Sequence, residues 1–508
     1  LPSISQSTGV IESEDHFYEY ALRSLFYRVN YSYKGKYLIE ANGRYDGSSR
    51  FPKDDRFGFF PSFSAGWRIS EEPFMENTRG YIDNLKVRAS WGSIGNQNVD
   101  YYAYLATMAA KNDLKWILAG GDKYVTTLEV PGLVSSSFTW ETVNTLDVGI
   151  DLNVFNRLGL VFDWYKRDTK DMLTTAKPLP SVLGATAPKV NAANMTSKGW
   201  ELALTWNDQI GKVKYNIGFN LYDSQSRITR YNNEDQLLTY VDANDNNIEK
   251  MYYREGMEFG EIWGYQTDRF YTVNDFVDGK LKTDIPAFRG QNRDNVKPGD
   301  ILYKDLDGNG EISNGDNSLN NPGDLRVIGN STPRYQYGIT GGVSYRNFDL
   351  SFFFTGVGKR DLWIDQLWIP NGQFPKGLEY YQMDYWTTEH PDSFYPRLYG
   401  EGGNDTYNHN RQTKYLYNGA YIRLKNVTVG YNLPKAICAK LNIQKFRVFV
   451  SGENLFTVHH LPDGYYPDTY SMSPASNKIN ANIEGDSSAN GWAYPLMRQY
   501  SFGINLTF

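Results

Sequence analysis

One stretch of the sequence combines the residue types and the spacing of a calcium-binding loop. It reads Asp-Leu-Asp-Gly-Asn-Gly-Glu-Ile-Ser-Asn-Gly-Asp over residues 305–316, which fits the twelve-residue loop of an EF-hand. Calcium takes about six to eight oxygen ligands, and the loop requires Gly at its sixth position, where Gly310 stands. The predicted ligands are Asp305, Asp307, Asn309, Glu311 through its backbone carbonyl, Ser313 directly or through a water, and Asp316.

The alternative is a turn that binds nothing, because Asp, Asn and Gly favour turns in any case. The loop ends on Asp316 rather than on Glu, which shortens the reach of the closing carboxylate. No amphipathic helices flank it, so a calcium sensor is disfavoured. We predict a structural calcium ion that stiffens the long connection 225–333, whose ordering otherwise costs entropy.

Two further connections, residues 358–419 and 455–496, are rich in aromatic side chains. Aromatic rings can stack on the flat C–H faces of sugars. The candidate substrate contacts are Trp363, Trp368, Tyr381, Trp386 and Tyr465. An equally good interpretation is that these rings pack the loops or become buried against a partner protein, since aromatic residues are enriched at interfaces.

Catalytic motifs are missing from the sequence. It contains no G-x-S-x-G, no H-E-x-x-H and no phosphate-binding G-x-x-x-x-G-K-[ST]. The adjacent His459 and His460 lie in a polar connection, where solvated side chains are expected. We therefore predict a protein that is not an enzyme.

Composition narrows the class of protein further. The chain has 508 residues with 40 Tyr, 27 Phe, 12 Trp and 46 Gly, and charged residues make up only 22%. Its net charge of -6, without a basic block, argues against a nucleic-acid partner. The single Cys438 excludes an internal disulfide bond. No run approaches the roughly 18 apolar residues of a membrane helix.

Apolar and polar residues alternate with a period of two along most of the chain, which is typical of β-strands with two different faces. The C-terminal run is the clearest, with Tyr500, Phe502 and Ile504 opposite Ser501 and Gly503. About 13 strands are predicted: residues 21–33, 36–48, 57–69, 85–95, 144–155, 157–167, 198–207, 212–224, 334–345, 347–357, 420–431, 443–454 and 497–508.

Short and long connections alternate between these strands, as in outer-membrane β-barrels, which have short turns on one side and long external loops on the other. A soluble β-sandwich is the alternative, but it has no reason to sort its loops in this way. An aromatic girdle is predicted from tryptophans near strand ends: Trp67, Trp91, Trp140, Trp164, Trp200 and Trp206. The apolar parity changes between Leu424 and Val427, which predicts a bulge near Asn426.

Several motifs resemble the C-terminal barrel portion of SusC/RagA-like TonB-dependent outer-membrane transporters. The matching stretches are Arg-Tyr-Asp-Gly-Ser-Ser-Arg-Phe (44–51), Lys-Gly-Trp-Glu (198–201), Gly-Asp-Ile-Leu-Tyr-Lys-Asp (299–305), Ser-Thr-Pro-Arg-Tyr (331–335), Tyr-Ile-Arg-Leu-Lys-Asn (421–426), Gly-Tyr-Asn-Leu-Pro (430–434), Ser-Gly-Glu-Asn-Leu-Phe (451–456) and the last strand, which ends in Phe508. Each stretch alone is a weak signal, but together they are specific and span nearly the whole chain.

The resemblance implies an all-β fold, a transmembrane antiparallel barrel of 22 strands of which this chain would hold about 13. An N-terminal plug and a TonB-binding segment are expected upstream of this segment. The resemblance further implies the outer membrane of a bacterium, and import of oligosaccharides or peptides together with a SusD-like surface lipoprotein. A dimer of such transporter–lipoprotein pairs is one assembly that it allows.

Three functions are compatible with the sequence. The first is the barrel subunit of a nutrient importer. The second is a barrel-anchored surface receptor or adhesin without transport, and the third is a soluble calcium-dependent lectin or hydrolase. The sequence begins Leu-Pro-Ser-Ile, and an odd strand count would place Leu1 and Phe508 on opposite sides of a membrane, so we expect a partial chain.

Overall fold

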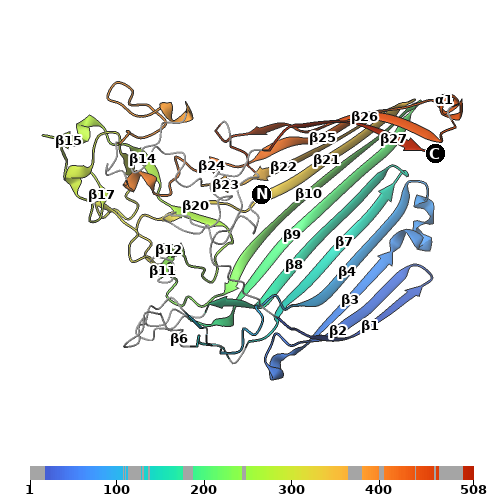
Figure 1. The fold of residues 1–508 in the computed structure, drawn as a ribbon, viewed down its shortest axis with the longest axis horizontal. Coiled ribbons are helices and arrows are strands. Elements are labelled where there is room, and N and C mark those ends of the chain that lie inside the picture. The colour runs from blue at the N-terminus through green and yellow to red at the C-terminus, as the bar shows by residue number, and fades with distance from the viewer. Residues whose placement is uncertain are drawn as a thin grey trace, which may run out of the picture.

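A 13-stranded antiparallel sheet is the main element of the computed structural model. Each large strand pairs with the next large strand along the chain, so the sheet is a continuous meander (Figure 1). The structure describes residues 18–508 except 107, 109, 112–126, 129–130, 136–137, 176–186, 243–247, 364–379, 400–405, 441, 463–464 and 468–495. The prediction of an antiparallel all-β fold is therefore confirmed.

The strands of this sheet are β1 (Leu22–Tyr33), β2 (Tyr37–Ser48), β3 (Phe57–Arg68), β4 (Ile82–Asn96), β7 (Glu141–Val154), β8 (Leu158–Thr175), β9 (Lys189–Ile210), β10 (Val213–Arg230), β21 (Arg334–Tyr345), β22 (Phe348–Lys359), β25 (Tyr421–Asn432), β26 (Lys445–His459) and β27 (Gln499–Thr507). Strands β8 to β10 run farther than the sequence predicts, because their pairing continues into the long connections.

Shorter elements lie in the connections. The strands are β5 (Ala110–Lys111), β6 (Thr127–Leu128), β11 (Thr239–Asp242), β12 (Ile248–Met251), β13 (Glu261–Gly264), β14 (Thr267–Phe270), β15 (Phe276–Val277), β16 (Lys280–Leu281), β17 (Ala287–Phe288), β18 (Ile301–Tyr303), β19 (Glu311–Ile312), β20 (Arg326–Asn330), β23 (Asp361–Leu362) and β24 (Tyr417–Asn418). The helices are α1 (Lys435–Lys440) and the short 3-10 turns η2 (Lys53–Asp55), η3 (Ile69–Glu71), η4 (Pro73–Thr78), η6 (Val273–Asp275), η7 (Arg293–Asn295), η8 (Tyr380–Met383) and η9 (Thr406–His409). Among the described residues, no helix combines the length and the apolar character needed to cross a membrane.

The two ends of the sheet differ in their connections. At one end, which we call the turn end, strands are joined mostly by tight turns whose backbones adopt positive φ, as at Gly35 and Gly211 (66° and 59°). The long connections lie at the other end, which we call the loop end (Figure 1). The sorting of connections by length that the sequence indicates is thus present.

The two faces of the sheet differ in chemistry, and cross-strand partners share a face. Val148 pairs with Trp164 on one face, and Asp147 pairs with Tyr165 on the other. On the first, apolar face, large side chains are exposed, among them Ile217, Val450 and Phe502, whose relative exposures are 50%, 55% and 71%. An apolar face that the described residues leave exposed fits a lipid-facing barrel wall.

Two local predictions have different outcomes. The bulge near Asn426 is confirmed, because the register of β25 shifts between Leu424 and Asn426 against β26, where Asn454 has a φ of 52°. The placement of Trp140 in an interfacial girdle is wrong. Its side chain is only 7% exposed, packs on Phe51 and Phe60, and donates from Nε1 to the carbonyl of Arg56 at 2.9 Å.

Candidate functional site

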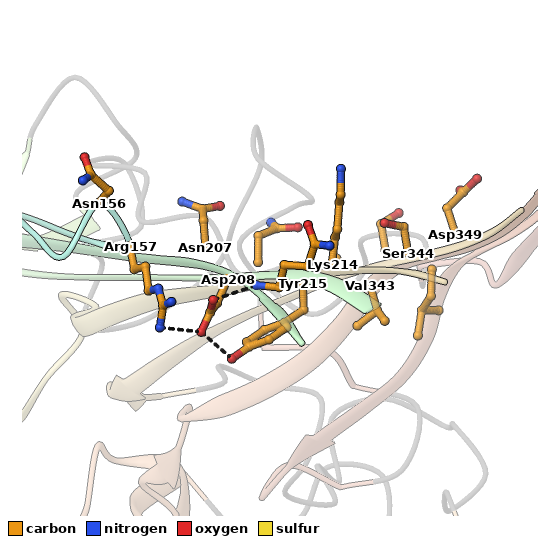
Figure 2. Close-up of a pocket in the computed structure, with 14 residues that line it drawn as sticks. Asn156, Arg157, Asn207, Asp208, Lys214, Tyr215, Val343, Ser344 and Asp349 are labelled. Atoms are coloured by element: carbon orange, nitrogen blue, oxygen red, sulfur yellow. Dashed lines mark hydrogen bonds and ion pairs between the residues drawn. The ribbon is translucent and has the colours of Figure 1, made fainter. Parts of the chain in front are cut away.

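A hollow of 670 Å³ lies on the polar face of β9, β10, β21 and β22 near the turn end. Figure 2 shows Asn207, Lys214, Ser344 and Asp349 pointing to one side of the sheet, into this hollow. Gly342 lies at the bottom of the hollow beside Asn216. A Cβ at position 342 would be only 2.4 Å from Asn216 Oδ1, so the absence of a side chain keeps this part of the hollow open. The hollow therefore offers amides, hydroxyls, the exposed ammonium group of Lys214 and the carboxylate of Asp349, which pairs with Arg447.

The opposite side of β9 and β10 carries a polar group at the edge of the apolar face. Asp208 forms an ion pair with Arg157 at 3.3 Å and accepts a hydrogen bond from the Tyr215 hydroxyl at 3.4 Å (Figure 2). The indole of Trp206 donates to the same hydroxyl at 3.4 Å. Aromatic rings with polar tips at the end of an apolar band are typical of a membrane interface.

A second hollow, of 420 Å³, lies on the polar face of β2, β3 and β4, and its chemistry is ionic. Arg88 lines it and binds three carboxylates, those of Asp163 at 2.7 Å, Asp151 at 3.2 Å and Asp147 at 3.3 Å. The Cβ of any other residue at Gly149 would lie 2.3 Å from Asp163 Oδ1, so glycine is needed to let this network form. The polar face around this second hollow is therefore held together by ion pairs.

Side chains from three of the long connections meet in one hydrophobic cluster at the loop end. Connection 225–333 contributes Phe270, Ile301, Tyr303 and Ile312; connection 358–419 contributes Leu362, Trp386, Tyr395 and Tyr415; connection 455–496 contributes Leu461. We call the described parts of these connections the loop module. Gln412, which is fully buried, links two of them through Nε2 bonds to the Tyr303 hydroxyl and the Asn408 carbonyl (3.0 and 2.9 Å).

The predicted substrate contacts fall mostly in this cluster. Trp386 is 8% exposed and lies against Gly299, where an added Cβ would meet its ring at 2.4 Å. Trp363 and Tyr465 are partly buried and pack on the same cluster. These positions favour the packing interpretation for the three rings. Trp368 lies outside the described residues, and of Tyr381 the structure describes only the backbone, in η8.

The predicted calcium loop projects from the loop module. Its strand β19 pairs with β17, and Ile312 enters the shared cluster. The Asp305 carboxylate closes the turn by accepting the backbone N–H groups of Gly308 and Gly310 at 2.7 and 2.8 Å. Asn309 and Ser313 also form local turn bonds, and the Glu311 carboxylate pairs with Arg289 at 3.3 Å.

The structure brings a different third carboxylate to this loop from the one that the sequence predicts. Oxygen atoms of Asp305, Asp307 and Asp324 lie within 4.8 Å of one another, and Asp316 is not in this group. Asp316 Oδ1 instead accepts the hydroxyl and the N–H of Ser318, at 2.6 and 3.1 Å. The twelve-residue template ends at Asp316, and Asp324 comes later in the sequence. The template therefore could not predict that Asp324 lies close to Asp305 and Asp307.

A tight return of the chain positions Asp324. Gly315 and Gly323 both have positive φ, and their backbones are so close that a Cβ on either would collide with the other. Asp324 is fully buried and accepts the N–H groups of Leu306 and Ser313 at 2.6 and 2.8 Å. Burial, with the nearby charges of Asp307 and Asp305, raises the pKa of Asp324, so a cation there would relieve the repulsion between carboxylates.

Comparison with known proteins identifies the barrel. The sequence model described as "TonB dependent receptor-like, beta-barrel" matches residues 5–455. The chain belongs to this family. The receptor is 29% identical over 504 residues to TonB-dependent receptor P3 of Formosa agariphila, covering 98% of this chain and 46% of that protein. It is 27% identical to TonB-dependent receptor SusC of Bacteroides thetaiotaomicron over 81% of this chain and 38% of SusC.

A solved structure shares the receptor's fold. The structure of the RagAB peptide transporter matches with a TM-score of 0.69 and 20% identity, over 96% of this chain and 47% of that one. The chain thus spans about half the length of the relatives it matches. The chain is of the SusC/RagA type, and its family is one of receptors of the bacterial outer membrane.

The loop module contains a carboxyl group that predicts a pH effect. Asp300 accepts bonds from the Tyr399 hydroxyl, Asn408 Nδ2 and the Lys297 N–H, at 2.8, 3.0 and 2.8 Å. Burial raises the pKa of Asp300. The charged form of Asp300 is therefore less stable in the folded state than in the unfolded state. The folded module gains stability as pH falls from the raised pKa of the folded state toward the pKa of the unfolded state.

We expect Asp300→Asn to remove this gain. The measured quantity is the free energy of opening the loop module in wild type minus the same free energy in the variant. This difference should stay constant at pH values above the raised pKa. It should then increase as pH falls, by at most about 1.4 kcal/mol per pH unit. Hydrogen exchange of the β18 amides measures this free-energy difference, once the intrinsic effect of pH on exchange is corrected for. Parallel pH profiles of the two proteins would contradict the expectation.

Proposed function

We propose that this chain forms barrel wall and external loops of a TonB-dependent importer of oligosaccharides or peptides. The family match carries the proposal. The two chemically distinct faces of the sheet support it, because an apolar face suits lipid and a polar face suits a water-filled lumen. In this proposal the loop end is extracellular and the turn end is periplasmic.

The proposed partners follow from the relatives. The similar solved structure is named as a peptide transporter. We propose that the protein containing this chain works with a SusD-like surface lipoprotein, as the resemblance to SusC implies. The loop module is where that lipoprotein would bind. Energy for import would come from TonB through a segment outside this chain, and the remaining strands of the barrel would pair with the free edges of β1 and β27.

A second proposal concerns calcium. We infer that the loop at residues 305–324 holds a structural calcium ion, with Asp305, Asp307 and Asp324 as carboxylate ligands. The donor set fits, since carboxylate oxygens are hard ligands and three of them lie within 4.8 Å. Asn309, Glu311 and Ser313 remain proposed oxygen donors, and Asp316 becomes a capping group for Ser318. When bound, the ion supplies positive charge and fixes the turn.

Deletion of the gene for the full-length receptor tests import. The deletion strain should lose growth on one polymer-derived oligomer, either a saccharide or a peptide, and regain it from a plasmid copy. A detergent pull-down of the tagged receptor, with mass spectrometry of the bound protein and ligand, should recover a surface lipoprotein. Growth like wild type on every oligomer would favour the non-transporting receptor or adhesin. A monomer that is soluble without detergent would favour the lectin or hydrolase.

A further inference from the structure

Four neighbouring connections at the turn end carry positive charge and contain no Asp or Glu. They join β7 to β8, β9 to β10, β21 to β22 and β25 to β26, and they are residues 155–157, 211–212, 346–347 and 433–444. Their charged residues are Arg157, Lys212, Arg346, Lys435 and Lys440. We call these connections the basic rim. The whole chain has a net charge of -6, so positive charge is concentrated at this edge of the sheet.

Most cations of the basic rim are exposed and have no acidic partner among the described residues. Those that form no ion pair there are Lys212, Arg346, Lys435 and Lys440. Arg157 differs from them, because it pairs with Asp208 at 3.3 Å. The rim therefore has positive charges that this part of the chain does not neutralise, and a negatively charged partner would supply the missing counterions.

Carboxylates near the basic rim already have partners. Asp83 accepts the backbone N–H of Asn156 at 2.5 Å, and Asp349 pairs with Arg447. The connection between β3 and β4, on the far side of β7, is acidic, with glutamates at positions 71, 72 and 76. The basic rim therefore covers the turn end from β7 to β26 and stops before β4.

Each connection of the basic rim also exposes a large apolar side chain next to its cation. These side chains are Phe155, Ile210, Tyr345 and Ile437, with relative exposures of 52%, 68%, 44% and 45%. The Arg346 guanidinium lies 5.2 Å from the centre of the Tyr345 ring. Arg346 and Phe155 have φ of 54° and 55°, a conformation in which glycine is less strained. The turns themselves therefore do not require these side chains.

The basic rim borders the apolar face of the sheet. Tyr345 pairs in register with Val213 and Phe348, which belong to that face. Figure 2 shows Arg157 on the same side of the sheet as Tyr215, with Lys214 on the other side. A plug that fills the lumen would meet the polar face, so this outer edge would stay accessible.

We propose that the basic rim binds the anionic headgroups of the phospholipid leaflet at the turn end. The inference rests on the outer-membrane location of the family and goes beyond the import function. Lys and Arg near a membrane surface attract anionic lipids, and apolar side chains beside them enter the boundary between headgroups and acyl chains. An acidic soluble protein would need only the cations. The combination of cations with exposed apolar side chains therefore favours a lipid surface.

Titration of the full-length receptor in detergent with phosphatidylglycerol, followed by native mass spectrometry, tests this proposal. The first variant combines Lys212→Gln, Arg346→Gln and Lys435→Gln, which removes three charges. The second combines Lys212→Arg, Arg346→Lys and Lys435→Arg, which keeps them. Arg157 is left unaltered, because its loss would leave Asp208 without its partner.

The control variant makes the same change of charge at exposed positions of the loop end, with Lys53→Gln, Lys282→Gln and Lys359→Gln. Zwitterionic phosphatidylcholine is titrated in parallel. Glycerol phosphate, which has a phosphate but no acyl chains, is added as a competitor. Circular dichroism shows whether each variant keeps its β-structure.

The unaltered receptor should bind phosphatidylglycerol more tightly than phosphatidylcholine. The first variant should lose about fivefold in affinity for phosphatidylglycerol, which is the effect of one cation near an anionic surface, while the second variant and the control keep it. Equal affinity for the two lipids, equal losses in the first variant and the control, or displacement by glycerol phosphate would each overturn the proposal. An acidic protein that binds through the same cations, without any preference for phosphatidylglycerol, would also overturn it.

Discussion

Removing calcium is expected to open the loop module of the full-length receptor to proteolysis. A ligand that binds only the folded state stabilises it by about 2.7 kcal/mol when its concentration is one hundred times its Kd. Without the ion, Asp305, Asp307 and buried Asp324 repel one another at distances within 4.8 Å. Cleavage within residues 225–333 should therefore speed up by about one hundredfold in chelator and return to its original rate with added calcium.

Two single variants separate the ligand seen in the structure from the one that the sequence predicts. Asp324→Ala should abolish stoichiometric calcium, measured by mass spectrometry, and make cleavage insensitive to chelator. Asp316→Ala removes only the cap on Ser318, so it should keep both calcium and the effect of chelator. Because Asp324→Ala also removes bonds to Leu306 and Ser313, calcium content rather than stability decides. The site would be refuted if Asp324→Ala still bound calcium, or if the unaltered receptor bound none.

Breaking the ion pair between Arg334 and Asp223 is expected to destabilise the junction of sheet and loop module. Their side chains are 18% and 7% exposed and form two hydrogen bonds, one of them 2.5 Å long. Tyr335, with a φ of 52°, donates its N–H to the same carboxylate at 3.3 Å. Asp223→Ala leaves a guanidinium group nearly buried without its partner, which costs about 3–5 kcal/mol.

Hydrogen exchange at the start of β21 measures this cost. The exposed pair of Lys189 and Asp100, with side chains 60% and 78% exposed, provides the control. Asp100→Ala should change the exchange free energy by less than about 1 kcal/mol. The double variant Asp223→Ala with Arg334→Met should recover part of the loss, because no charge is then left buried. Equal effects of Asp223→Ala and Asp100→Ala would contradict the expectation.

Local patterns in the sequence were enough to predict the large sheet. Alternation with a period of two depends only on which residues follow one another, and it survives wherever one face meets lipid and the other meets water. The bulge at Asn426 was visible for the same reason, since an extra residue reverses the parity of the strand. Trp140 was misplaced because a position near a strand end does not reveal whether other segments cover it.

The calcium loop shows where such local reasoning ends. The types and spacing of the oxygen donors around Asp305 and Asp307 can be read from the sequence, because these residues belong to one continuous turn. The presence of Asp324 beside them depends on the fold, because two close glycine backbones turn the chain back. Burial of Trp386 depends likewise on segments distant in sequence. Packing and register, unlike spacing, are set by contacts between those segments.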